Sequence, residues 1–453
     1  MYAQRHNRRQ FIEAAAAGVG VWTIGIQARA QDGTSAARSK QPVDALPMTG
    51  IGAPQLAAYD KLMLSFMREH TPPGAALAVT KAGRLVYARG FGHADRERHE
   101  PVEPTSLFRI ASLGKSLSSA AIFQLVEKGR LKLDAKVFGL LRISPYLAPG
   151  AKIDPRLREV TVLDCLHHAG GWDRDKGFDP MGADAAEQIA KALKIGLPIR
   201  PEHIIRYTFG RRLDFDPGKA FAYSNFGYCV LGRVIEEASG QRYGQYLQKE
   251  VLAPLGIRRM KLGKNLLIDR APGEVRYYDS TNRIGRAISG PRIGQQAPLP
   301  YGVECIETMD ANGGWIASAV ELLRFTSSLD DPRKCPVLSE KSIREIMARP
   351  GGVLGYAANG KPKPDFYGCG WEVRPANVER GKWTKWHTGG LAGSSTLMVC
   401  RNDDIDWVVL FNCDATRDGK AFADIIDPLL HGPADQIKNW PEGDLFDKLL
   451  AGH

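Results

Sequence analysis

Apolar residues follow a strand pattern near both ends of the chain and a helix pattern between them. The runs AALAVT (residues 75–80) and RLVYAR (84–89) are β-prone and are joined by Lys-Ala-Gly, which predicts a hairpin. Strand signals return late in the chain as YGCGWEV (367–373), STLMVC (395–400) and DWVVLFN (406–412). Strands at both ends predict one antiparallel sheet that the two ends of the chain complete together.

The intervening residues predict helices. Residues 53–69 form a first candidate helix. Leu113, Leu117 and Leu125 recur at helical spacing and predict a second helix that begins near Leu113. Ser318 is the expected N-cap of a later helix. The sequence therefore predicts an α+β fold, with an antiparallel sheet flanked by helices and an inserted, mostly helical lobe.

The first thirty residues have the composition of an export signal. Arginines and the run NRRQFI come first, a weak apolar stretch follows, and Ala28-Arg29-Ala30 offers a small-x-small cleavage site. The paired arginines are typical of a twin-arginine signal. We expect residues 1–30 to be removed after Ala30, which leaves a periplasmic or otherwise exported protein with no stable membrane span. The alternative is a frayed amphipathic N-terminal helix.

The charge of the chain is moderately basic. Its formal net charge of +11 falls to about +8 without residues 1–30, and the Lys and Arg residues are scattered along the sequence. Scattered cations are typical of a solvated surface, so we expect no nucleic-acid partner.

Seven cysteines leave at least one thiol unpaired if the protein is exported. Their spacing matches no zinc pattern, and the sequence also lacks His-Glu-x-x-His, dinucleotide-binding and phosphate-loop motifs. We therefore predict no metal and no cofactor. The sequence does not determine a disulfide pairing, and several of these cysteines fit the role of buried apolar residues.

A single Ser-x-x-Lys motif, Ser112 and Lys115, lies where the second predicted helix begins. Residues three apart share one face of a helix, so the lysine amine can reach the serine hydroxyl. A partly desolvated lysine has a lowered pKa and can act as a base. One such motif arises often by chance.

Two further motifs follow in the chain. Tyr223-Ser224-Asn225 is the only Tyr-x-Asn in the sequence, and a tyrosine phenol beside a lysine can relay a proton. Taken alone, it also fits a buried tyrosine beside a helix cap. His387-Thr388-Gly389-Gly390 precedes a predicted strand and taken alone fits a glycine turn.

Together, in this order, the three motifs resemble those of the serine β-lactamase and penicillin-binding protein family. The resemblance is greatest to the branch of class C β-lactamases, D-aminopeptidases, D,D-carboxypeptidases and esterases. Flanking text such as FDPGKAFAYSNFGYCVLGRVIEEASG agrees. Residues 31–52 are polar, with Gly, Ser, Lys and Pro, and predict a linker. The resemblance implies a catalytic domain over 53–430, followed by a tail over 431–453, and a small molecule or short peptide as the substrate, such as a fragment derived from the cell wall. Within the domain it implies an α/β lobe over about 53–111 and 309–430, and a helical lobe over about 112–308.

The resemblance also implies roles for individual residues. Ser112 would be the acylated nucleophile, Lys115 its base and Tyr223 a proton relay. The backbone N–H groups of Ser112 and Gly390 would form the oxyanion hole. The substrate-binding residues would be Asn225, His387, Thr388 and Gly389.

His387 stands where the penicillin-recognising members have a lysine. Histidine is mostly uncharged at neutral pH, so we expect weaker selection of carboxylated substrates and unchanged acyl transfer. We also expect His387 to donate one hydrogen bond and to support Tyr223. The sequence thus favours an exported serine hydrolase acting on esters or small D-amino-acid peptides and amides.

Two alternatives stay open at this point. The same residues allow β-lactam hydrolysis or D,D-carboxypeptidase activity. A non-catalytic binding module on the same fold is the other alternative, but such a module is expected to have lost Ser112, Lys115 or Tyr223, and all three are present.

Overall fold

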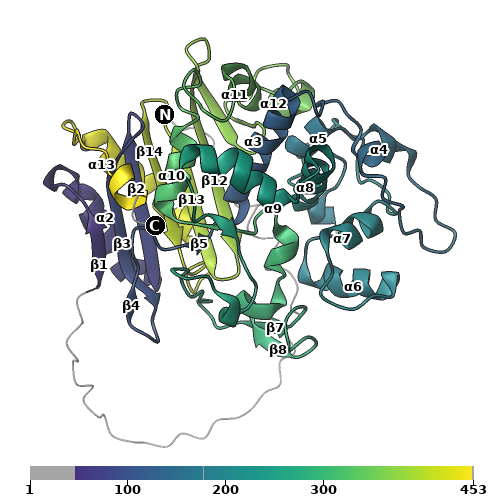
Figure 1. The fold of residues 1–453 in the computed structure, drawn as a ribbon, viewed down its shortest axis with the longest axis horizontal. Coiled ribbons are helices and arrows are strands. Elements are labelled where there is room, and N and C mark those ends of the chain that lie inside the picture. Colours follow the sequence, from purple (N-terminus) through teal and green to yellow (C-terminus); the bar gives the residue numbers. More distant parts are fainter. Residues whose placement is uncertain (1–45, 177, 451–453) are drawn as a thin grey trace, which may run out of the picture. The chain divides into compact units, whose positions relative to one another are not determined.

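The computed structural model describes residues 46–176 and 178–450. One large antiparallel sheet organises them, in the strand order β1-β3-β2-β14-β13-β12-β11-β10, with β4 paired to the end of β3 (Figure 1). Its strands are β1 (Met48–Ile51), β2 (Gly74–Lys81), β3 (Arg84–Asp95), β4 (Glu100–Pro101), β10 (Phe366–Tyr367), β11 (Glu372–Asn377), β12 (Lys382–Leu391), β13 (Ser394–Cys400) and β14 (Ile405–Phe411).

The centre of the sheet joins the early and late parts of the sequence. β2 pairs with β14 in antiparallel register from Lys81 opposite Ile405 to Ala75 opposite Phe411. Figure 1 shows the purple strand β2 beside the yellow strand β14. The predicted fold class and the closure of the sheet by the two ends are confirmed.

Alternate residues of the central strands enter two separate cores, as the two-residue period of a strand requires. Ala75, Leu77 and Val79 face a core built with α2 (Ala57–His70) and α13 (Phe422–Gln436). Ala76 and Ala78 face the larger core, which contains α3 (Gly114–Glu127), α8 (Asn225–Ser239) and α10 (Ala319–Ser327). Both faces of the sheet are therefore covered.

The segment between the two halves of the sheet is mostly helical, as predicted. Its helices besides α3 and α8 are α4 (Val137–Leu141), α5 (Val162–Leu166), α6 (Ala183–Leu193), α7 (Pro201–Thr208) and α9 (Tyr243–Tyr246). Residues 263–308 contain a small hairpin of β7 (Ile284–Arg286) and β8 (Gln296–Pro298). A three-stranded sheet combines β5 (Phe108–Arg109), β9 (Trp315–Ala317) and β6 (Lys261–Leu262).

Two predicted boundaries differ from the structure. The expected linker over 31–52 ends in β1, which pairs with β3. The expected tail over 431–453 contains the end of α13 and the short helix α14 (Phe446–Leu450), whose Phe446 is 1% exposed. β1 fits the fold through its backbone pairing with β3, whereas α14 fits because it buries Phe446. The predicted signal over 1–30 lies outside the described residues.

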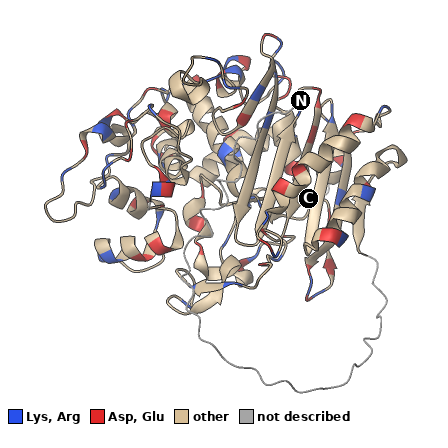
Figure 2. Cartoon of the chain, turned by 180° about the vertical axis from the view of Figure 1, so that it is seen from behind, with Lys and Arg blue, Asp and Glu red and all other residues tan. Residues whose placement is uncertain are grey.

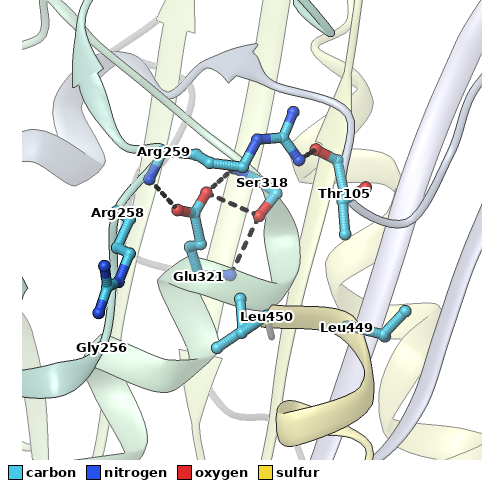
Figure 3. Close-up of a pocket in the computed structure, with 8 residues that line it drawn as sticks. All are labelled: Thr105, Gly256, Arg258, Arg259, Ser318, Glu321, Leu449 and Leu450. Atoms are coloured by element: carbon cyan, nitrogen blue, oxygen red, sulfur yellow. Dashed lines mark hydrogen bonds between the residues drawn. The ribbon is translucent and has the colours of Figure 1, made fainter. Parts of the chain in front are cut away.

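The predicted cap at Ser318 is confirmed and belongs to a hydrogen-bonded junction. The Ser318 hydroxyl accepts from the backbone N–H of Glu321, while Glu321 in turn accepts from the backbone N–H groups of Arg259 and Met260. Figure 3 shows Ser318, Glu321 and Arg259 in a small pocket that Leu449 and Leu450 also line. Because the polar groups that line the pocket hydrogen-bond to one another, they connect α10 to the neighbouring segments. We therefore assign the pocket a structural role.

Two short helices, α11 (Glu340–Ile346) and α12 (Gly352–Gly355), lie between α10 and the edge strand β10 in the sequence. Figure 2 shows Lys and Arg interspersed with Asp and Glu over the helices and strands in that view.

All seven cysteines are free thiols, and Cys335 alone among them is not buried. Within residues 46–176 and 178–450, no helix has the length and apolar character needed to cross a bilayer.

Candidate active site

The structure brings the Ser-x-x-Lys and Tyr-x-Asn motifs together. Ser112 lies in a 3-10 turn, Ala111–Leu113, immediately before α3, and Lys115 is in the first turn of that helix. The Lys115 Nζ is 3.0 Å from the Ser112 Oγ and 4.8 Å from the centroid of the Tyr223 ring. The three side chains predicted to share protons therefore converge.

The turn that presents Ser112 is held by neighbouring strands. Ala111 has a φ of 49°, which an L-residue rarely adopts. On β13, the Thr396 hydroxyl donates to the Ile110 carbonyl at 3.0 Å, and the Ser394 hydroxyl donates to the Arg109 carbonyl at 2.6 Å. These two bonds fix the backbone just before Ser112, so the sheet determines where the Ser112 hydroxyl points.

The Lys115 amine is completely enclosed. Besides Ser112, its Nζ lies 2.8 Å from the Asn225 Oδ1 and 2.8 Å from the Asn312 backbone oxygen. Burial, with the nearby charge of Arg174, lowers the pKa of Lys115 well below its usual value. Loss of water penalises the ammonium form, and no carboxylate hydrogen-bonds the amine among the described residues to offset that penalty.

A neutral amine matches these three neighbours. It has two N–H donors, which suit the oxygens of Asn225 and Asn312, and one lone pair, which can accept from the Ser112 hydroxyl. The arrangement therefore offers a base directly beside a hydroxyl. Asn225 was expected to orient the substrate; in this structure its Oδ1 orients Lys115.

Tyr223 is packed on its ring faces. Burial raises its pKa above the usual value, while a hydrogen bond with the Ser112 side chain opposes that rise. The ring of His168 lies 4.2 Å from the Tyr223 ring, centroid to centroid. The His168 Nδ1 accepts from the backbone N–H of Ser224 at 3.1 Å. His168 thus positions the Tyr-x-Asn turn.

β12 carries the third motif along the other side of the site. A Cβ at Gly389 would lie 2.4 Å from the Thr396 Oγ1 and 2.7 Å from the Ile110 oxygen, so glycine is required there. β12 consequently passes directly against the turn before Ser112. Gly390 is exposed, and a Cβ at Gly390 would meet nothing within 4 Å. Its position beside this turn is compatible with the oxyanion role implied for its N–H.

His387 is buried and neutral. Its Nδ1 is 2.6 Å from the Thr388 carbonyl oxygen, which can only accept, so Nδ1 carries the proton. Nε2 then accepts from the Tyr367 hydroxyl at 3.0 Å. Burial and the nearby Lys115 lower the pKa of His387 to about 3. The expectation that His387 supplies no fixed cation therefore agrees with the structure.

The expected support of Tyr223 by His387 takes an indirect form. Their rings are 6.4 Å apart, and the single N–H of His387 is committed to Thr388. Tyr367, which bonds His387, packs beside both rings, at 6.3 Å from the Tyr223 ring and 5.8 Å from the His387 ring. Tyr367 was not predicted from the sequence, although it begins the YGCGWEV run used to predict a strand.

A second buried charge cluster lies further along β12. Lys385 forms an ion pair with Asp330, and both lie near Asp406 and Cys400. Asp330, Cys400 and Asp406 could together hold a metal ion, yet the Lys385 ammonium already neutralises this group. The neighbouring carboxylate raises the pKa of Lys385, whereas burial raises that of Asp406 well above its usual value. We interpret the cluster as a structural anchor of β12.

Comparisons with known proteins agree with this geometry. The Beta-lactamase family model matches residues 59–428. Esterase EstB from Burkholderia gladioli is 32% identical over 259 residues, which cover 56% of this chain and 61% of the esterase. Penicillin-binding protein 4* from Bacillus subtilis is 25% identical over 332 residues, 73% of this chain and 66% of that protein.

A probable fimbrial assembly protein FimD from Dichelobacter nodosus is 33% identical over 183 residues, 40% of this chain and 42% of that protein. The chain thus spans less than two thirds of the length of these three relatives.

Two solved structures show the same fold. An octameric penicillin-binding protein homologue from Pyrococcus abyssi is 26% identical with a TM-score of 0.59, covering 84% of this chain and 78% of its own. A D-amino acid amidase from Ochrobactrum anthropi SV3 is 20% identical with a TM-score of 0.62, covering 85% of this chain and 99% of its own.

Proposed function

Because the chain belongs to the β-lactamase family of serine hydrolases, we propose that it hydrolyses substrates through an acyl-enzyme on Ser112. The observation that carries the proposal is the set of three partners around the Lys115 Nζ, which suits a neutral amine accepting the Ser112 proton. A lysine held as a permanent ammonium could not act as that base.

The proposed reaction has two steps. The Ser112 Oγ attacks the substrate carbonyl while its proton moves to the Lys115 amine, and the tetrahedral oxyanion accepts from the N–H groups of Ser112 and Gly390. Each such donor contributes about 3 kcal/mol. Tyr223 passes a proton to the leaving group as the carbonyl–leaving-group bond breaks. Water then attacks the acyl-enzyme by the same proton path and releases the acid.

Esters and small D-amino-acid peptides or amides are the proposed substrates. An esterase and a D-amino acid amidase are among the similar proteins. The neutral His387 also argues against strong selection of β-lactams through the third motif. Turnover of a chromogenic cephalosporin at rates equal to the best ester would favour β-lactam hydrolysis instead.

Labelling with a fluorophosphonate probe tests the nucleophile. We expect the wild-type protein to be labelled and Ser112→Ala to lose the label. Ser116→Ala is the matched control, since Ser116 is on the same helix but its hydroxyl donates to the Leu113 carbonyl. A label that persists in Ser112→Ala would place the nucleophile elsewhere. Absence of label and turnover in the wild type would favour a binding module.

We also propose export directed by residues 1–30. The arginine pair at 8 and 9 and the small-x-small site ending at Ala30 support this proposal. The mature protein recovered from the cell envelope is expected to begin at Gln31. Replacing both arginines by lysine should retain the precursor in the cytoplasm, and unchanged export would contradict a twin-arginine route.

A further inference from the structure

The active site lacks a permanent cation from the third motif. His387 is neutral, and its only N–H is bonded to Thr388. Lys115 favours its neutral form, and its amine is surrounded by Ser112, Asn225 and Asn312. Neither of these groups offers a charged donor to a substrate anion.

Arg174, which lies outside the three motifs, places a permanent positive charge beside Tyr223. Its guanidinium carbon is 5.1 Å from the centroid of the Tyr223 ring, a cation–π distance. The Arg174 side chain is 23% exposed, so it is partly sheltered yet open to solvent on one side. Its charge adds to the burial that lowers the pKa values of Lys115 and His168, and it opposes the rise that burial causes in the pKa of Tyr223.

The loop that carries Arg174 is held in place. The backbone N–H of Asp214 donates to the Gly171 carbonyl at 2.8 Å, and the Asp214 carboxylate accepts from the backbone N–H of Asp173 at 2.8 Å. Arg174 follows immediately, in the 3-10 helix Arg174–Lys176. The guanidinium is therefore presented from a backbone that is fixed on its N-terminal side.

The acidic groups around Arg174 leave most of its donors available. Among the described residues, its one ion pair is with Asp175, at 3.8 Å from Nε to Oδ1, and Asp175 is 60% exposed. Neither terminal nitrogen takes part in that contact. Asp179 and Glu372 add negative charge within electrostatic range of Lys115 and Tyr223, respectively.

We propose that Arg174 binds a carboxylate on the leaving-group half of the substrate. The inference rests on the proposed function, because it concerns the same site and takes Tyr223 as the proton donor to the leaving group. A guanidinium over the Tyr223 ring adjoins that half, and its paired terminal N–H groups fit the two oxygens of a carboxylate. The preferred substrates are then peptides or esters whose leaving group ends in a free carboxylate.

A matched pair of esters tests this assignment. The acetyl esters of 3-hydroxybenzoate and of methyl 3-hydroxybenzoate have the same reacting bond and differ in one negative charge. We expect Arg174→Gln to lower kcat/KM for the carboxylate ester by about tenfold to a hundredfold more than for the methyl ester, which also senses the loss of the charge beside Lys115. Lys176→Gln removes a neighbouring charge whose side chain is 59% exposed, and it should change neither ester by more than about twofold.

Other results would overturn the inference. Equal losses on both esters in Arg174→Gln would mean that Arg174 acts through Lys115 or Tyr223. Equal losses in Lys176→Gln and Arg174→Gln would mean that only the general charge matters. Either result, with fluorophosphonate labelling of Ser112 intact, refutes carboxylate binding and leaves the proposed function standing. A wild-type protein that is neither labelled nor active on either ester would refute the proposed function, and the inference with it.

Discussion

The Asn225 Oδ1 lies 2.8 Å from the Lys115 Nζ and thereby links the second motif to the first. An amide oxygen accepts one N–H without requiring a charge on the amine. The neutrality of the Asn225 side chain is therefore as important to the site as its position.

Asn225→Asp replaces the neutral amide beside Lys115 by a carboxylate of almost the same shape. A carboxylate 2.8 Å from the amine favours the ammonium form, so the pKa of Lys115 should rise. We expect the acidic limb of the pH profile of kcat/KM to move to higher pH by about 1–3 units, with activity at neutral pH reduced at least tenfold. A pH–rate profile measures this. Equal loss at every pH would instead indicate misplacement of substrate.

Gly389 and Gly390 are adjacent but should tolerate alanine differently. The added Cβ at Gly389 would overlap the Thr396 hydroxyl and the Ile110 carbonyl, whereas at Gly390 it would enter open space. Gly389→Ala should cost about 1–3 kcal/mol of unfolding free energy. It should also lower kcat about a hundredfold by displacing the Ser112 turn. Gly390→Ala should keep the stability of the wild type, and urea unfolding of both variants checks the difference.

The buried His387 should make the folded state sensitive to acid. Its pKa is about 3 in the folded protein and near 6.5 when unfolded, so the unfolded state binds more protons between these values. The contribution of the neutral His387 to the unfolding free energy is then fully present above pH 6.5 and is lost as the pH falls towards 3. Each such histidine contributes about 1.4 kcal/mol per pH unit within that window.

The variant His387→Gln should lack that contribution. The difference in unfolding free energy between wild type and variant should shrink by about 1.4 kcal/mol for each unit below pH 6. Urea titrations at pH 6.5, 5.5 and 4.5 provide the measurement. A constant difference between wild type and His387→Gln would show that His387 is protonated in the fold.

The ion pair of Lys385 and Asp330 should matter most when one partner is removed. Lys385 is 4% exposed, so Asp330→Asn leaves a buried ammonium without its carboxylate. We expect a loss of about 3 kcal/mol in unfolding free energy. Adding Lys385→Met to that variant should recover much of the loss, because the uncompensated charge is gone. Thermal and urea unfolding of the three proteins tests this, and additive losses would contradict it.

Sequence reasoning succeeded where spacing alone fixes geometry. Ser112 and Lys115 are three residues apart at a helix start, which places the amine beside the hydroxyl whatever surrounds them. The strands were predictable because their apolar runs are distinct. The resemblance to a family then supplied Tyr223, which no local pattern would have linked to Lys115.

What the sequence could not provide depends on contacts between distant segments. The tautomer of His387 is set by Thr388 and by Tyr367, twenty residues earlier in the chain. Arg174 lies in an irregular loop, and its approach to Tyr223 depends on how that loop is tied to Asp214. Asp330, which pairs with Lys385, lies just after the end of α10 and 55 residues before Lys385 in the chain. Pairings across such separations leave no periodic trace.

The pairing of β2 with β14 has a consequence for biosynthesis. During translation β2 is made more than three hundred residues before its central neighbour, so its edge stays unsatisfied until nearly the whole polypeptide has left the ribosome. Nascent or truncated chains should therefore need chaperone protection against intermolecular strand addition. Release from that protection should coincide with the emergence of residues 405–411.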